Sequence, residues 1–194
     1  MPVVIAISGP IGSGKDTIAD YLVHHHGFKR LAFASKVKDV AHVVFGWDRV
    51  LLEGLTAESR AWREVVDPFW GLSPRVALQR IGTEMFRTHI HPDTWVKTVV
   101  SQIVGEPDGK FVITDCRFEN EVAAMKALDG RLVCVSRGDE PFWAASARAG
   151  AACPAEIHQT DWNVYRLQGM ADVQVKNNGS LEELYEAVEK ILSE

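Results

Sequence analysis

The strongest chemical signal in the sequence is a short glycine-rich segment near its start. The segment reads Gly9-Pro10-Ile11-Gly12-Ser13-Gly14-Lys15-Asp16-Thr17 and lies between an apolar run and a helical pattern. Such a loop turns backbone N–H groups toward one point, the helix start adds partial positive charge, and the lysine reaches terminal phosphates. Glycines let the backbone approach an anion where a side chain would collide. The segment predicts a phosphate-binding loop with contacts from Gly9, Ile11, Gly12, Ser13, Gly14, Lys15, Asp16 and Thr17.

One position of this loop departs from the usual pattern. Asp16 stands where a serine or threonine normally offers its hydroxyl to Mg²⁺. A carboxylate is also a magnesium ligand, either directly or through water. Thr17 either replaces the missing hydroxyl or contacts a phosphate, and Asp16 has the alternative of being an ordinary acid favoured by the helix dipole.

A second signal is an apolar strand that ends in a carboxylate. The segment Phe111-Val112-Ile113-Thr114-Asp115 places Asp115 at the carboxyl end of a strand, where open parallel sheets bind ligands. We expect Asp115 to act near the magnesium, with a helix-capping acid as the alternative. Arg117 would lie at the same rim and compensate the charge of a transferring phosphoryl group, unless it is a surface arginine.

The spacing of apolar residues predicts the elements that hold these groups in place. Five short apolar runs indicate strands at 3–8, 31–34, 111–114, 132–136 and 173–175, and helical patterns lie between most of them. Strands alternating with helices predict an α/β fold, a three-layer sandwich with a central parallel sheet of about five strands and helices on both faces. We expect helices at 14–26, 36–45, 74–87, 92–104 and 119–128, and a closing helix capped by Ser180 with Glu183.

Length and composition limit the classes of protein that this chain can belong to. Its 194 residues suit one domain, within which 46–106 is a candidate insertion and the polar, alanine-rich stretch 137–154 a candidate lid. A net charge of -5 argues against binding a nucleic acid polymer, because such binding needs a broad basic field. No run of about 18 apolar residues occurs, so no membrane span is expected. Three unpaired cysteines fit a reducing compartment, and a cytoplasmic location is expected by default.

The late part of the chain helps to choose among phosphate-loop proteins. A guanine-specific GTPase would carry an Asn-Lys-x-Asp element there, whereas this chain reads Val175-Lys176-Asn177-Asn178-Gly179-Ser180. A small chain with a lid fits a kinase of small metabolites. Transfer to a phosphate acceptor needs no general base, because the attacking oxygen is already ionised near neutral pH.

Several segments together resemble the bacteriophage-type deoxynucleoside monophosphate kinases. The resemblance rests on the loop ending Gly-Lys-Asp-Thr, on Leu78-Gln79-Arg80-Ile81-Gly82-Thr83-Glu84 with Arg87, on Asp93-Thr94-Trp95-Val96, and on Thr114-Asp115-Cys116-Arg117-Phe118-Glu119-Asn120-Glu121. It implies a P-loop nucleoside monophosphate kinase fold and transfer of the ATP γ-phosphate to a deoxynucleoside monophosphate with Mg²⁺.

The resemblance also implies roles for individual residues. The reaction centre would comprise Lys15, Asp115, Arg117 and Arg137, with Asp16, Thr17 and Asp115 toward the metal. The acceptor side would comprise Lys36, Lys38, Gln79, Gly82, Thr83, Glu84, Arg87, Asp93, Trp95 and Glu121. Arg137 and Arg148 would belong to the lid that closes over ATP, and Asn177 and Gly179 to a turn near the adenine.

Other interpretations remain open at this point. Lys36, Lys38 and Arg148 could be ordinary surface charges, and the turn at 177–180 a plain helix cap. The family often shows His-x-Ser-Glu before an aromatic residue, whereas His158-Gln159-Thr160-Asp161-Trp162 stands here, which leaves a role for His158 open. A dephospho-coenzyme A kinase, or a nucleotide-binding module without efficient turnover, would share the loop. Tryptophans without an assigned place could line a homodimer interface.

Overall fold

The computed structural model describes residues 1–193, which form two compact units. Within the described residues, the sheet unit comprises 1–32 and 100–193, and the helical unit comprises 33–99. The helical unit begins at residue 33, before the start of the predicted insertion (46–106), and it ends at residue 99, before the end of that insertion.

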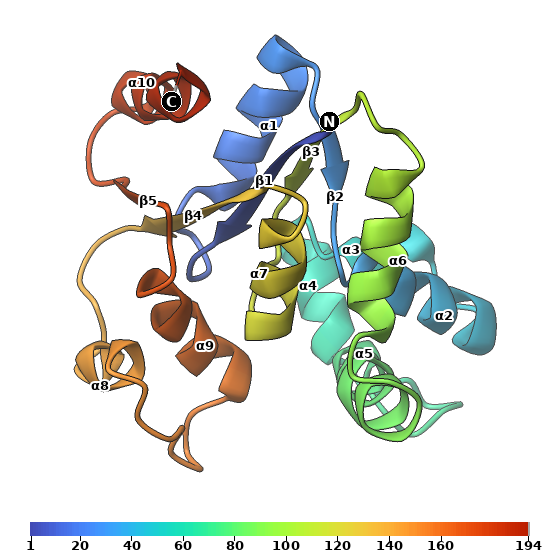
Figure 1. Ribbon diagram of the computed structural model, residues 1–194. Helices are drawn as coiled ribbons and strands as arrows, with labels where there is room; N and C mark the ends of the chain where they lie inside the picture. Colours follow the sequence, from blue (N-terminus) through green and yellow to red (C-terminus); the bar gives the residue numbers. More distant parts are fainter. Residues whose placement is uncertain (194) are drawn as a thin grey trace. The chain divides into compact units, whose positions relative to one another are not determined.

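A single parallel sheet forms the centre of the sheet unit (Figure 1). Its strands are β1 (Val3–Ser8), β2 (Lys29–Leu31), β3 (Lys110–Ile113), β4 (Arg131–Ser136) and β5 (Val173–Lys176), in the spatial order β2-β3-β1-β4-β5. All four pairings are parallel, and Ile5 of β1 lies opposite Val112 on one side and Arg131 on the other. The prediction of a five-stranded parallel sheet is confirmed.

Helices cover both faces of this sheet. Figure 1 shows α1 (Lys15–His26) and α10 (Leu181–Ser193) on one face and α7 (Glu119–Lys126) on the other. Burying alternate residues of β1 against opposite layers explains its nearly continuous apolar sequence. The core between the sheet, α1 and α10 contains Ile5, Ile7, Ile18, Leu22, Val133, Leu184 and Val188.

The ends of these helices follow from local sequence. Gly14 and Gly27 adopt left-handed backbone conformations on either side of α1, a conformation that glycine enters without a Cβ penalty. Before α10, the Ser180 hydroxyl accepts from the Glu183 N–H at 3.2 Å, and the Glu183 carboxylate accepts from the Ser180 N–H at 3.3 Å. The predicted capping box is confirmed.

The segment after β4 contains more structure than the sequence patterns indicated. A short helix, α8 (Ala144–Arg148), packs against α9 (Gln159–Gln168), a helix that sequence analysis missed. Trp143 stacks on Trp162 with ring centroids 5.4 Å apart, and Ala144 and Ala147 fill the space beside them. Helix α9 has no simple apolar stripe because it is buried on several sides, and even its polar Asn163 and Gln168 are inside.

The helical unit consists of short helices without a sheet. In chain order they are α2 (Ser35–Phe45), α3 (Arg49–Glu53), α4 (Ala57–Glu64), α5 (Pro74–Gln79), a π-helix η1 (Arg80–Thr88), and the start of α6 (Thr94–Val104). The helix predicted at 74–87 is therefore two elements, and the wider turn begins at Arg80. No helix within residues 1–193 has the length and apolarity that crossing a membrane requires.

Candidate active site

The loops that follow four neighbouring strands form one edge of the sheet unit. Strand β1 leads into the glycine loop, β3 into Asp115, β4 into Arg137 and β5 into Asn177. This is the edge at which parallel sheets bind ligands. A cavity of about 310 Å³ opens there, lined by Gly12, Gly14, Lys15, Asp16, Thr17, Arg137, Asn177, Gly179, Ser180, Leu181 and Leu184.

The backbone of the loop requires glycine for two different reasons. At Gly9, with φ +157°, an added Cβ would overlap the carbonyl oxygen of Val135 and lie 2.8 Å from the Ser13 hydroxyl. Gly9 therefore permits close approach of the loop to β4. At Gly12, with φ +79°, a Cβ would meet no protein atom within 4 Å, so its requirement is the left-handed conformation alone.

The side chain of Asn177 supports the backbone of the glycine loop. Its Nδ2 donates to the backbone oxygen of Ser13 at 2.9 Å, and a Cβ on Gly14 would collide with the same amide group. Asn177 is only 9% exposed, although it also contributes to the cavity wall. Asn177 therefore fixes the shape of the phosphate loop, and its place near the adenine stays a prediction.

The ammonium group of Lys15 lies over the loop that precedes it. Its Nζ donates to the Pro10 oxygen at 2.7 Å. Burial, together with the nearby charge of Arg117, lowers the pKa of Lys15 to about 8, although Asp16 acts in the opposite direction. A cation that is held partly buried beside a second cation is a favourable place for a polyanion.

The carboxylate of Asp16 is exposed at the start of α1. Arg30 of β2 donates to the Asp16 backbone oxygen at 2.9 Å, and the same nitrogen lies 3.6 Å from its carboxylate and 3.4 Å from that of Asp20. Sequence analysis missed Arg30, because a lone arginine in an edge strand carries no motif. Thr17 is half-buried and lines the cavity together with Asp16.

The segment after β3 contains two of the predicted residues, Asp115 and Arg117, and a third, Glu121, lies in α7. Asp115 and Arg117 are half-buried, whereas Cys116 between them is 1% exposed. Glu121 is also 1% exposed and accepts hydrogen bonds from the backbone N–H groups of Arg117 and Phe118. The expectation that Glu121 faces the acceptor is wrong for this structure, because its carboxylate is inside the sheet unit.

The two predicted lid arginines have different surroundings. Arg137 is exposed and lines the cavity. Arg148 instead makes a two-pronged contact with the carboxylate of Glu140, at 2.8 and 2.6 Å, and a 2.6 Å bond to Gln168. Its guanidinium is thus used within the segment around α8 and α9, so the expectation that it faces ATP does not match this structure. His158 caps α9 by accepting from the Thr160 N–H.

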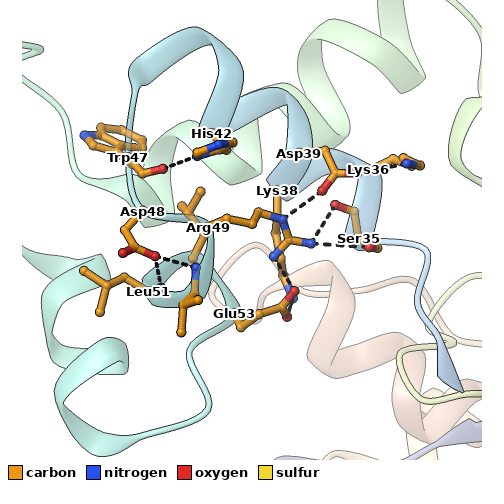
Figure 2. A network of polar contacts seen from close by, with 12 residues as sticks. Ser35, Lys36, Lys38, Asp39, His42, Trp47, Asp48, Arg49, Leu51 and Glu53 are labelled. Carbon is orange, nitrogen blue, oxygen red and sulfur yellow. Dashed lines mark hydrogen bonds and ion pairs between the residues drawn. The ribbon is translucent and has the colours of Figure 1, made fainter.

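Within the helical unit, the predicted acceptor lysines belong to a network of charges (Figure 2). Lys36 pairs with Asp39 at 2.9 Å, and Lys38 pairs with Glu53. Arg49 joins the two pairs because it contacts both carboxylates, and its Nε lies 2.8 Å from Asp39. The network spans α2 and α3. The lysines are therefore not isolated surface charges.

The remaining acceptor candidates lie on or beside η1. Gln79, Thr83 and Glu84 are exposed, and Arg87 and Asp93 are half-buried. The indole of Trp95 is 3% exposed and donates to the Gly82 oxygen at 2.8 Å. The expectation that Trp95 contacts the acceptor is wrong for this structure, because its ring packs against Phe86 inside the helical unit.

Comparison with known proteins agrees with this geometry. The chain is 26% identical over 201 residues to a protein of Acanthamoeba polyphaga mimivirus provisionally described as a deoxynucleotide monophosphate kinase, with 96% of this chain and 94% of the relative covered. It is 24% identical over 202 residues to the deoxynucleoside-5'-monophosphate kinase of Escherichia phage T5, covering 73% of this chain and 81% of that protein.

A solved structure supports the fold assignment. The dephospho-CoA kinase from Campylobacter jejuni superposes with a TM-score of 0.52 at 14% identity, covering 99% of this chain and 96% of that one. This likeness confirms the predicted P-loop kinase fold. The family model described as deoxynucleotide monophosphate kinase matches residues 52–188, which is most of the chain. The chain therefore belongs to the deoxynucleotide monophosphate kinase family.

Proposed function

We propose that this protein transfers the γ-phosphate of ATP to a deoxynucleoside 5'-monophosphate and releases the diphosphate. One observation carries the proposal: the cavity at the carboxyl edge of the sheet contains the glycine loop, Lys15 and Arg137 in a chain of this family. The family match covers 52–188 and so does not include the loop at 9–17. The loop supports binding of the donor phosphates, and the family match, over a separate part of the chain, supports the deoxynucleotide kinase activity.

The donor triphosphate would occupy the loop cavity. Backbone amides of the loop and the first turn of α1 would bind the phosphate oxygens, because the first N–H groups of a helix have no partner within the helix. The Ser13 N–H would first give up its bond to the Pro10 oxygen. Lys15 would exchange its bond to the Pro10 oxygen for a phosphate oxygen. Asn177 and Gly179 would lie toward the nucleoside, at the wall formed by the turn after β5.

Catalysis would consist of positioning and charge neutralisation. The acceptor phosphate already has an ionised oxygen, so no side chain needs to remove a proton from it. Lys15, Arg117 and Arg137 would supply positive charge to the transferring group. The electrostatic influence of Arg117 on Lys15 supports placing these two cations in one reaction centre.

Residues at the same edge fit a magnesium ion that is shared with the nucleotide. Asp16 and Thr17 offer a carboxylate and a hydroxyl to the cavity, and Asp115 follows β3. Within residues 1–193, no group of three His, Cys, Asp or Glu side chains could hold a metal ion. Mg²⁺ commonly takes one or two carboxylates together with phosphates and water, and the donors fit that arrangement. When bound, the ion would neutralise charge on the phosphates.

The acceptor nucleotide would use residues of the helical unit. Gln79, Thr83 and Glu84 are the exposed candidates on α5 and η1. Lys36 and Lys38 could bind the acceptor phosphate while they stay paired with Asp39 and Glu53, because a lysine ammonium has three N–H donors. The homodimer and the cytoplasmic location expected from the sequence remain predictions.

An assay of ADP release tests the proposal and its alternatives together. Purified protein is incubated with ATP, Mg²⁺ and each of the common deoxynucleoside monophosphates, dephospho-coenzyme A, or no acceptor. We expect turnover with at least one deoxynucleotide and none with dephospho-coenzyme A. Lys15→Ala should abolish transfer while circular dichroism shows a native fold. Turnover with dephospho-coenzyme A alone, or with no acceptor of the panel, would refute the assignment.

A further inference from the structure

We propose that Glu121 is a positioning residue that fixes the backbone of Arg117, in the turn after β3, in the geometry that phosphoryl transfer needs. The inference deepens the proposed function and rests on it. The carboxylate Oε2 of Glu121 accepts a hydrogen bond from the Arg117 N–H at 2.8 Å and another from the Phe118 N–H at 3.1 Å. A buried acceptor with two backbone donors holds that backbone firmly, because breaking either bond would leave a buried polar group without its partner.

Helix capping explains only one of these two hydrogen bonds. Phe118 is the cap residue of α7 and Glu121 is its third helical residue, so a capping box accounts for the bond from the Phe118 N–H. The bond from Arg117 is the shorter one and lies outside the helix. Glu121 therefore fastens the turn before α7 as well as the start of the helix itself.

The turn that is fastened in this way is the one that carries the candidate reaction-centre residues. Cys116 is buried, whereas Asp115 and Arg117 on either side of it are half-buried. Anchoring the Arg117 backbone therefore limits where its guanidinium can lie. That guanidinium is close enough to Lys15 to lower the pKa of the ammonium.

A displacement of this turn should slow the chemical step more than it weakens ATP binding. Misplacing a catalytic group by 1 Å can cost about 100-fold in rate. The loop that binds the triphosphate is a separate segment, with its own brace from Asn177. Loss of the Glu121 anchor should thus lower kcat and change KM for ATP little.

The experiment compares the ADP-release kinetics of Glu121→Ala, Arg117→Ala and the double variant with wild type. We expect Glu121→Ala to lower kcat at least about tenfold, with KM for ATP within about threefold. If Glu121 acts through Arg117, the double variant should be no slower than Arg117→Ala alone. Glu119→Ala is the matched control, because it removes an exposed carboxylate from the same helical turn, and its kcat should match wild type.

Two conservative variants keep the inference falsifiable if Glu121→Ala does not fold. Glu121→Gln keeps the reach of the side chain and an acceptor oxygen, whereas Glu121→Asp keeps the charge and loses reach. We expect Glu121→Gln to retain the higher kcat. Unchanged kcat in Glu121→Ala, additive losses in the double variant, or a higher kcat in Glu121→Asp would each overturn the inference.

Amide hydrogen exchange separates failure of this inference from failure of the proposed function. In the wild type, the Arg117 and Phe118 amides should exchange slowly, and they should exchange faster in Glu121→Asp while β1 amides are unchanged. Unprotected amides in the wild type would overturn the inference whatever the activity. A wild type that turns over no deoxynucleotide refutes the proposed function, and with it the catalytic part of the inference.

Discussion

Substituting the two glycines of the phosphate loop should give different losses of stability, because the structure uses them differently. A Cβ on Gly9 would overlap the Val135 carbonyl oxygen in β4, a backbone group in the centre of the sheet. Overpacking a core typically costs about 1–3 kcal/mol, and an unfavourable backbone conformation adds about 1–3 kcal/mol. Gly9→Ala should therefore lower the free energy of unfolding by about 2–6 kcal/mol.

Gly12→Ala is the matched control within the same loop. Its Cβ meets no protein atom within 4 Å, so only the left-handed backbone conformation costs energy. That penalty is about 1–2 kcal/mol, and the smaller entropy of the unfolded alanine chain offsets about 0.4–1 kcal/mol of it. The net loss should be about 1 kcal/mol.

Thermal unfolding followed by circular dichroism measures both losses. For a chain of this length, 1 kcal/mol corresponds to about 2–4 °C in Tm, so Gly9→Ala should lower Tm by about 4–24 °C and Gly12→Ala by about 2–4 °C. Gly12 lines the cavity, so Gly12→Ala should weaken ATP binding although it lowers Tm less than Gly9→Ala does. Equal Tm values for the two variants would refute the distinction between close approach and backbone conformation.

Three further predictions concern the same cavity. Asn177→Ala leaves the Ser13 carbonyl without its donor, so the free energy of unfolding should fall by about 1–3 kcal/mol in calorimetry, and an unchanged Tm would contradict the bracing role. Because burial and a neighbouring arginine lower the pKa of Lys15 to about 8, and bound phosphate should raise it again, ATP binding should take up a proton above pH 8. The apparent affinity should then fall about tenfold between pH 7 and pH 9 in isothermal titration, and a slope that persists in Lys15→Arg would exclude the lysine as its cause. Asp16→Asn should raise the Mg²⁺ concentration needed for half-maximal rate, whereas Arg30→Ala should lower it by freeing the Asp16 carboxylate; identical magnesium titrations for wild type and both variants would remove Asp16 from the metal site.

Local sequence was sufficient for the elements whose pattern is strong. The apolar run of β1, the glycine loop and the capping box of α10 each carry their own signal within a few residues. Helix α9 carried no such signal, because a helix buried on several sides lacks the one-sided stripe that marks a surface helix. The division of 74–88 into α5 and η1 likewise left no mark in the spacing of apolar residues.

The chemistry of the candidate site divides in the same way. The sequence by itself determined that the chain has a phosphate loop, since the required residue types are adjacent and their spacing is the signal. Only the tertiary structure decided what the other charged residues do. Glu121 is buried under the Arg117 turn, Lys36 and Lys38 are paired with acids, and Arg148 is held by Glu140. The physical reason is that the effect of a charged side chain depends on its burial and on its partners, and folding brings those partners from distant positions in the chain.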